Sequence, residues 1–236
     1  MSSKISQEPS GLAGLEASQR DLELFELVRG ELYTAVISDS LDELGFRDQA
    51  MREYIRPLAA ESTLVGWART ILCMDLHYVS EEPYRTEIEA VDSILPGEVV
   101  VVATGCSKRN APWGELLSTA AVVRGARGCV TDGLVRDTRK ILEMGFPVFC
   151  AGIKPVDSKG RGIVVNYNLP VECGGVIVNP GDLVVADCDG VVVIPQAAVA
   201  ETLRAAADKV SRENHSREDL RKGAFLRDVF AKYGVL

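Results

Sequence analysis

Short valine-rich segments recur along this chain, and two of them follow the same turn. Residues 96–103 read PGEVVVVA, and residues 180–186 read PGDLVVA. A Pro-Gly pair sets a tight turn, and the β-branched residues behind it favour a strand. Because turn chemistry alone explains this likeness, we do not interpret it as a gene repeat.

Strands and helices are mixed along the whole sequence. Period-two or continuous apolar runs predict strands at 64–73, 98–104, 127–131, 148–151, 162–165, 176–178, 182–186 and 190–194. Apolar spacings of three and four, with glycines at the ends, predict helices at 18–32, 34–44, 114–124, 138–144, 196–210, 216–222 and 225–232. This mixture predicts an α/β (mixed) or α+β sandwich in one domain.

Composition shifts at both ends suggest the domain limits. Residues 1–14 are polar and small, which predicts a flexible N-terminus, and residues 15–210 carry the mixed elements of one domain. Residues 211–236 form a charged tail with a thin apolar stripe. Such a tail is poorly stabilised alone, so we expect it to pack on another subunit. The stripe consists of Leu220, Phe225, Leu226, Val229 and Phe230.

Charge and composition exclude several classes of protein. The formal net charge is −8, which argues against a nucleic-acid partner. No apolar run approaches the roughly 18 residues of a membrane span, and the N-terminus lacks the pattern of a signal peptide. The six cysteines form no C-x-x-C pair, which is typical of free thiols in a reducing cytoplasm. With only two histidines, a histidine-based zinc site is not expected.

Residues 114–117, GELL, offer a candidate anion site at a helix start. The first amides of a helix have no intrahelical acceptor and lie at its positive end. A substrate carboxylate or enolate can bind there, and Gly114 allows close approach to the backbone. The alternative is a plain helix N-terminus, at which the negative charge of Glu115 interacts favourably with the helix dipole.

Residues 132–137, DGLVRD, offer a second candidate twenty-odd residues later. Asp132-Gly133 after a strand predicts a turn. Arg136 supplies a planar fork that matches a carboxylate, and Asp137 can bind a hard cation such as Mg²⁺. The alternative is a surface ion pair. The two segments lie one strand apart, which favours one joint site.

Other candidates have simpler explanations. Asp187 and Asp189 could form a rival metal site, although a turn between two strands explains an Asp-Gly pair better. Asp39 and Asp42 suit helix capping or a solvated helix face. Lys154 could be imagined as a Schiff-base lysine, but a loop lysine before proline is commoner. No glycine-rich nucleotide-binding motif occurs.

Residues 114–137, GELLSTAAVVRGARGCVTDGLVRD, resemble the RraA-like family. That family includes 4-hydroxy-4-methyl-2-oxoglutarate and 4-carboxy-4-hydroxy-2-oxoadipate aldolases and the regulators of RNase E activity. The resemblance is carried by an acidic residue, Glu115, separated by twenty residues from Arg136-Asp137, together with the segments PGEVVVVA and PGDLVVADCDGVVVIP. The resemblance implies a layered α-β-β-α sandwich, a trimer or dimer of trimers, and a divalent cation.

The resemblance also implies roles for individual residues. Asp137 would be the direct protein ligand of Mg²⁺ or Mn²⁺, and Glu115 would hold a metal-bound water. Arg136 would bind the substrate carboxylate and the enolate oxygen, together with Gly114 and the amides of Leu116 and Leu117. Arg136 and Glu115 would thus be the catalytic residues.

Two further acids and one lysine complete what the resemblance implies. An acid from a neighbouring subunit's C-terminal region would reach the metal waters, with Glu213 as the candidate and Glu218 behind it. Family members often have aspartate where this chain has Glu115, and an acidic residue where it has Lys140. A lysine beside the metal waters would change the local charge.

The expected function is a metal-dependent carbon–carbon lyase that cleaves a 4-hydroxy-2-oxo acid to pyruvate, with oxaloacetate decarboxylation as a related activity. The general base stays open, with a metal-bound water favoured over histidine. The alternatives are a non-catalytic binding protein like the RNase E regulators and a lyase for another sugar-acid-derived substrate. The small 2-oxo acid and other copies of the chain are the expected partners.

Overall fold

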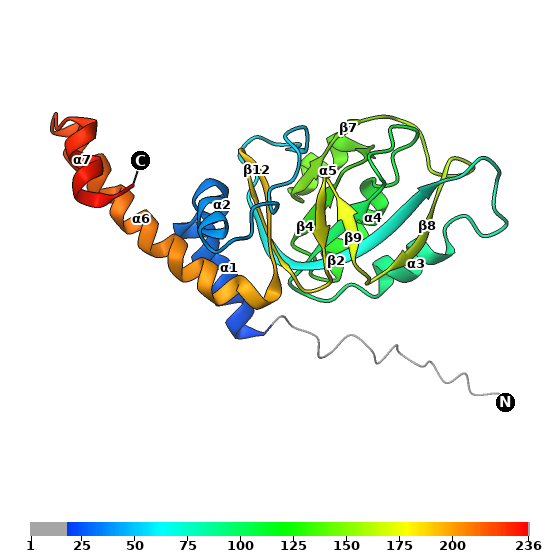
Figure 1. Cartoon of the computed structure of the whole chain (residues 1–236). Coiled ribbons are helices and arrows are strands. Elements are labelled where there is room, and N and C mark those ends of the chain that lie inside the picture. Colours follow the sequence, from blue (N-terminus) through cyan, green and yellow to red (C-terminus); the bar gives the residue numbers. More distant parts are fainter. Residues whose placement is uncertain (1–17, 236) are drawn as a thin grey trace.

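The computed structural model describes residues 18–235, and the predicted flexible segment 1–14 lies outside these residues. Figure 1 shows a body of strands and short helices from which a long C-terminal helix projects. The α-helices are α1 Gln19–Glu31, α2 Thr34–Glu43, α3 Arg85–Asp92, α4 Glu115–Val123, α5 Thr138–Met144, α6 Val199–Arg221 and α7 Leu226–Tyr233, and a 3₁₀ turn spans Gln196–Ala198.

The strands form one large sheet and two small ones. The large sheet has the order β1-β6-β4-β3-β2-β11-β12, with β8 also paired to β2. Strands β2, β3, β4 and β6 run parallel, whereas β8, β11 and β12 are antiparallel to their neighbours. The bounds are β1 Arg56–Pro57, β2 Leu64–Asp75, β3 Glu98–Ala103, β4 Gly128–Thr131, β5 Leu134–Val135, β6 Val148–Cys150, β7 Gly152–Ile153, β8 Gly162–Tyr167, β9 Val171–Cys173, β10 Val176–Val178, β11 Leu183–Asp187 and β12 Gly190–Ile194.

The large sheet curls so that one of its faces forms an inner core. Val99 and Val101 of β3 pack in the same buried cluster as Val193 of β12, although β3 and β12 are far apart in the strand order. Val100 and Val102 point to the opposite face, because successive side chains of a strand alternate. The continuous valine runs are therefore buried on both faces, as is typical of covered sheets.

Helices cover the two outer faces of the curled sheet. Helices α3, α4 and α5 pack on the β3–β4–β6 part through residues such as Val91, Ala121 and Ile141. Helices α1, α2 and α6 pack on β11 and β12 through residues such as Phe25 and Ile37. The layers follow the order α-β-β-α, and the predicted mixed α/β fold is confirmed.

Local chemistry explains the start of α1 and the ends of α5 and α6. The Ser18 side chain accepts a hydrogen bond from the amide of Asp21, 3.2 Å away, and so caps α1. Helix α5 ends at Gly145, whose φ of 69° suits glycine. The predicted separate helices at 196–210 and 216–222 were wrong, because α6 runs unbroken from Val199 to Arg221. No glycine or proline lies between these residues, and the first glycine, Gly223, follows the helix end.

Short elements escaped prediction. Strands β1, β5, β7 and β9 have two or three residues, which is too few to show a period. The eight-residue helix α3 was also missed, although it carries an apolar face. The segment 134–135, predicted as part of a turn, forms β5 and pairs with β7 in parallel. This small pairing places the following residues, Arg136 and Asp137.

The cysteines differ in their exposure. All six cysteines are free thiols; Cys106 and Cys188 are exposed and the other four are buried. Across residues 18–235, no helix combines the length and apolar character that crossing a bilayer requires.

Substitution of Gly128 tests how closely β4 packs against its neighbours. A Cβ at this position would lie 2.5 Å from Leu64 Cδ1 and 2.7 Å from the carbonyl oxygen of Pro147. We expect Gly128→Ala to lower the free energy of unfolding by about 1–3 kcal/mol, because the backbone of β4 must shift. Urea denaturation measures the change.

The matched control is Gly30→Ala in α1. A Cβ there meets nothing within 4 Å, and alanine favours a helix by about 0.5–1 kcal/mol over glycine. If both variants had equal stability, the tight contact at Gly128 would be contradicted.

Candidate functional site

A cavity of about 590 Å³ lies at the carboxyl ends of the parallel strands. The segment after each of four parallel strands contributes to it: α3 after β2, the start of α4 after β3, residues 136–140 after β4, and residues 157–158 after β6. Ligands of α/β proteins commonly bind at this edge of the sheet. The lining residues are Tyr84, Glu87, Ile88, Pro112, Gly114, Glu115, Leu116, Leu117, Arg136, Asp137, Lys140, Asp157 and Ser158.

Backbone pairing brings the two predicted segments together. Trp113 forms a parallel bridge with Val135, and the amide of Arg136 donates to the carbonyl of Trp113 over 3.0 Å. Gly114 leaves room for this contact, since a Cβ there would lie 2.9 Å from Asp137 Oδ2. The helix start and the Arg-Asp pair therefore share one wall of the cavity.

The start of α4 keeps free backbone donors. Gly114 is the N-cap and offers no side chain, and the amides of Leu116 and Leu117 lie in the first turn, where no helical acceptor exists. The amide of Glu115 faces Asp137 Oδ2 at 3.4 Å. An anion placed beside these amides would also meet the positive end of the helix.

Arg136 is held by a carboxylate that was not predicted. Its Nη2 lies 3.1 Å from Asp157 Oδ1, whereas its Nε is 4.0 Å from Asp137 Oδ2. The hydroxyl of Tyr84 donates to Asp157 Oδ2 over 2.6 Å. Asp157 thus fixes the guanidinium from one side and leaves other N–H groups free for a ligand.

These contacts set the charge states of both partners. Partial burial opposes ionisation of Asp157, but hydrogen bonds from Tyr84 and the Lys159 amide, with the charge of Arg136, hold its pKa below the usual value. The hydrogen bond to Asp157, aided by burial, raises the pKa of Tyr84 to about 12. Tyr84 therefore stays protonated and donates at neutral pH.

Glu115 and Lys140 interact at the mouth of the cavity. Lys140 Nζ lies 3.9 Å from Glu115 Oε2, and Thr119 donates to Glu115 Oε1 over 3.1 Å. Both side chains are in reach of solvent, so this ion pair adds little stability. Asp137, at a left-handed φ of 57°, leaves 45% of its side chain exposed.

The cavity has more carboxylates than cations. Its walls carry the four acids Glu87, Glu115, Asp137 and Asp157, against Arg136 and Lys140. Excess carboxylate oxygen suits a hard cation such as Mg²⁺, which usually keeps several waters and binds few protein ligands. The donor set at Asp137 and Glu115 therefore fits the divalent cation that the sequence suggested.

Glu87 lines the cavity and was missed in the sequence. Within residues 18–235, its carboxyl group makes no hydrogen bond or ion pair. Desolvation, with the nearby charge of Asp157, raises its pKa to about 7, although Arg136 acts in the opposite direction. The signal was present: Glu87 precedes Ala90, Val91 and Ile94 by three, four and seven residues, which puts a carboxyl group on the apolar face of α3.

The C-terminal acids lie away from this cavity within the same chain. Glu213 of α6 accepts a hydrogen bond from Tyr33 and lies 3.9 Å from Arg217. Burial and this bond raise the pKa of Tyr33 to about 12. Glu218 is exposed on the same helix. A role for either acid in a neighbouring subunit's site stays a prediction.

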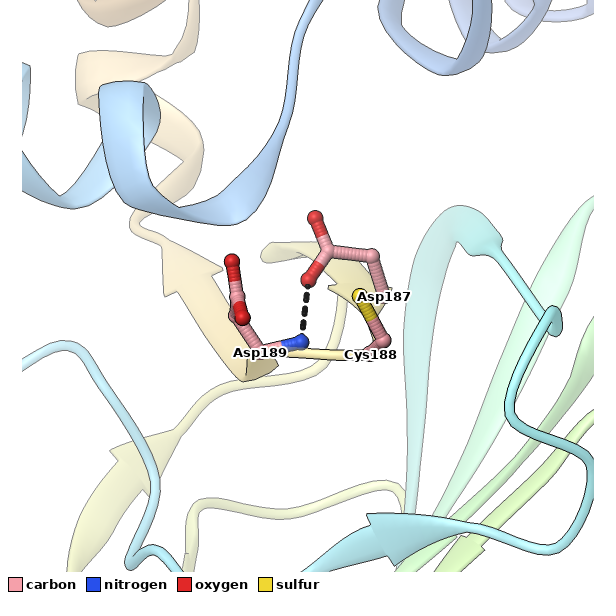
Figure 2. Close-up of side chains that lie close together, drawn as sticks. All are labelled: Asp187, Cys188 and Asp189. Atoms are coloured by element: carbon pink, nitrogen blue, oxygen red, sulfur yellow. Dashed lines mark hydrogen bonds between the residues drawn. The ribbon is translucent and has the colours of Figure 1, made fainter.

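The rival metal cluster is explained by a turn. Asp187, Cys188 and Asp189 place their ligand atoms within 4.8 Å of one another (Figure 2). The carboxylate of Asp187 accepts the amide of Thr34 at 2.8 Å and the amide of Asp189 at 2.9 Å, which caps α2 and closes the β11–β12 turn. The predicted turn is confirmed.

The other alternative residues also have structural partners. Lys154 donates to the carbonyl oxygen of Lys108 over 2.8 Å and does not line the cavity. Asp39 of α2 accepts from Lys209 of α6 over 2.8 Å, so it joins two helices rather than capping one. Neither arrangement resembles a reactive site.

Comparison with known proteins gives consistent results. The Aldolase/RraA model of the RraA-like family matches residues 34–193. A protein of Halalkalibacterium halodurans, named as a candidate 4-hydroxy-4-methyl-2-oxoglutarate aldolase, is 35% identical over 185 residues, which cover 78% of this chain and 82% of the relative.

Solved structures share the fold. Streptomyces coelicolor RraAS2, described as an unusual member of the RNase ES inhibitor RraA protein family, is 31% identical with a TM-score of 0.76, covering 83% of this chain and 97% of that one. An uncharacterized protein of Pseudomonas syringae pv. tomato is 26% identical with a TM-score of 0.77, covering 88% and 96%.

The raised pKa of Glu87 predicts how stability depends on pH. Its folded pKa of about 7 lies above the ordinary value of 4.5, so the stability that the neutral carboxyl group contributes is present below about pH 4.5 and is lost as pH rises to about 7. We expect Glu87→Gln to melt at about the wild-type temperature near pH 4.5, and roughly 3–6 °C higher at pH 8. Differential scanning calorimetry at both pH values measures this.

The control is Glu89→Gln on the exposed face of the same helix, where Glu89 pairs with Arg85 at 3.2 Å. It should show no rise in melting temperature at pH 8. A Glu87→Gln variant whose melting temperature tracks the wild type at both pH values would contradict the desolvated environment.

Proposed function

The chain belongs to the RraA-like family, and we propose that it is a divalent-metal-dependent carbon–carbon lyase that cleaves a 4-hydroxy-2-oxo acid and releases pyruvate. One observation carries this proposal. The Arg136-Asp137 pair lies against the free amides of α4, in a cavity with excess carboxylate oxygen. This combination suits a metal-bound 2-oxo acid.

Asp137 would hold the cation directly, and Glu115 would hold it through water. A bound Mg²⁺ or Mn²⁺ would supply Lewis-acid polarisation of the 2-oxo group. Apart from Asp187, Cys188 and Asp189, no three potential ligand residues cluster tightly in the described part of the chain. A hydrated ion with one direct protein ligand agrees with that spacing.

Arg136 and the start of α4 would orient the substrate. The free N–H groups of Arg136 can bind the carboxylate and the oxygen on which negative charge develops. The amides of Leu116 and Leu117 add neutral donors at the positive end of the helix. Because Asp157 already holds Arg136, little reorganisation is needed when the substrate binds.

Cleavage needs a proton to leave the 4-hydroxyl while the C3–C4 bond breaks. The products are a carbonyl compound and the enolate of pyruvate, which Arg136 stabilises. Decarboxylation of oxaloacetate yields the same enolate, so we propose it as a second activity of this cavity. The name of the Halalkalibacterium relative supports the aldolase assignment.

The second candidate is a non-catalytic binding protein. It is favoured by the likeness to RraAS2, whose title places it in a family of RNase ES inhibitors. Titration of metal against pyruvate release separates the two, since a binding protein would release none.

We further propose that the chain works as a trimer or a dimer of trimers. The tail predicted from the sequence exposes apolar side chains, with 68% of Phe225 and 55% of Leu226 accessible. We propose that in such an assembly Glu213 or Glu218 of one copy reaches the cavity of another.

Removal of metal tests the proposal first. EDTA should abolish pyruvate release from 4-hydroxy-4-methyl-2-oxoglutarate, and Mg²⁺ or Mn²⁺ should restore it, because Asp137 alone cannot polarise the 2-oxo group. A lactate dehydrogenase-coupled assay measures the release. Asp189→Asn, in the rival cluster, should leave the metal dependence unchanged. Full activity in EDTA, or a borohydride-trapped adduct on Lys154, would contradict metal catalysis.

Arg136→Lys tests the guanidinium. Lysine keeps the charge but cannot bind Asp157 and a ligand at once through a planar fork. We expect kcat/KM to fall by roughly 10²-fold, as for loss of an oxyanion donor. The matched control is Arg139→Lys, three residues away and 91% exposed, which should change little. Near-wild-type activity of Arg136→Lys would show that the fork does not hold the reacting group.

A further inference from the structure

Glu87 has a position that the roles above do not use. Glu87 lines the cavity that holds Arg136 and Asp137. It also borders an apolar hollow formed by residues such as Val91, Trp113 and Leu117 beneath α3. Glu87 therefore lies at the boundary between the apolar layer and the proposed substrate cavity.

The fold fixes this position. Ala90, Val91 and Ile94 are at most 4% exposed and anchor α3 on the sheet. Glu87 shares their face, being three, four and seven residues away. Glu87 is half-buried, and its place on this face directs it toward the cavity side of α3.

The cations of the cavity are engaged by other acids. Arg136 lies 3.1 Å from Asp157, and Lys140 lies 3.9 Å from Glu115. Glu87 consequently has no ion-pair partner within residues 18–235. Desolvation raises its pKa to about 7, whereas Asp157, across the same cavity, has a lowered pKa. When the environments of two acids move their pKa values apart in this way, the two acids can take different roles in catalysis.

We propose that Glu87 is the proton carrier of the cleavage: it takes the proton of the substrate's 4-hydroxyl and returns it to C3 of the enolate. This inference rests on the proposed lyase function. It names a side chain for a step that sequence reasoning left to a metal-bound water.

The step balances without any co-reactant. The 4-hydroxyl O–H bond breaks, its proton goes to the Glu87 carboxylate, and its electron pair forms the C4 carbonyl. The C3–C4 bond breaks, and its electrons form the enolate. Protonated Glu87 then donates to C3, which forms the methyl group of pyruvate and regenerates the carboxylate. A group that titrates near neutral pH can act in both directions.

The charges around Glu87 determine its pH dependence. Acidic and basic side chains face the cavity from α3, α4, the 136–140 segment and the 157–158 segment. Asp157 favours the protonated form of Glu87, and Arg136 favours the carboxylate. The titratable or charged residues that share the cavity with Glu87 are Tyr84, Glu115, Arg136, Asp137, Lys140 and Asp157. On the side toward β2, Glu87 also shares smaller pockets with Cys73 and Asp75.

Glu87→Gln tests the proposal in the full-length protein with Mg²⁺. For 4-hydroxy-4-methyl-2-oxoglutarate, we expect kcat to fall by roughly 10²-fold or more while KM stays within a few-fold, the loss typical of a missing general base. We expect kcat/KM of the wild type to rise with pH, and this rise should be absent in Glu87→Gln. Glu87→Asp should recover part of the rate, and Glu89→Gln should behave as wild type.

Two further readouts separate proton transfer from a structural role. Oxaloacetate decarboxylation needs no hydroxyl deprotonation, so Glu87→Gln should lose less than about 10-fold there, since only the returned proton is affected. Mg²⁺-dependent binding of oxalate, measured by calorimetry, should match the wild type. Exchange of the pyruvate methyl protons in D₂O, followed by NMR, should be lost.

The outcomes are distinguishable. If the wild type cleaves its substrate and Glu87→Gln cleaves equally well, the inference fails and the proposed function stands. If Glu87→Gln loses oxalate binding or both activities equally, Glu87 organises the site and does not carry the proton. If the wild type processes neither substrate with metal, the proposed function fails, and this inference with it.

Discussion

Strand β2 carries the hydrogen bonds on which both halves of the molecule depend. One edge pairs with β3 over residues 67–72, and the other edge is shared between β11 at residues 64–67 and β8 at residues 71–75. The parallel half of the sheet can therefore present its carboxyl ends to a cavity, while the antiparallel half curls back to close the inner core. A shorter β2 would leave one of these halves without an edge to pair with.

The cavity is organised by an unequal number of acids and bases. Arg136 lies nearest to Asp157 and more distantly meets Asp137, and Lys140 meets Glu115. Asp137 and Glu87 are then distinguished by solvent: Asp137 is partly exposed and remains available to a cation, whereas Glu87 lies against apolar side chains. One set of charges thereby yields groups with different proton affinities, without any histidine in the cavity.

The sequence predicted the parts of this site that local chemistry defines. The helix start at Gly114 and the Arg136-Asp137 pair each have a signature, and their spacing of one strand placed them together. Asp157 could not be found this way, because its partner Arg136 is distant in sequence and its loop has no periodic pattern. Most strand and helix positions were predicted to within a few residues. The break expected in α6 was wrong, since charged residues such as those around Glu213 continue a helix when no glycine or proline stops it.

Because α6 is unbroken, its length determines the direction in which α7 faces. At about 1.5 Å per residue, its 23 residues form a rod roughly 35 Å long, and Asp219 holds α7 to its end through Lys232, 2.9 Å away. Rotation about a helix is about 100° per residue, so inserting or removing one residue near the end of α6 would swing the apolar side of α7 by a quarter turn without altering the sheet. The direction in which that side faces is therefore encoded by the length of α6, and it can change in evolution independently of the chemistry in the cavity.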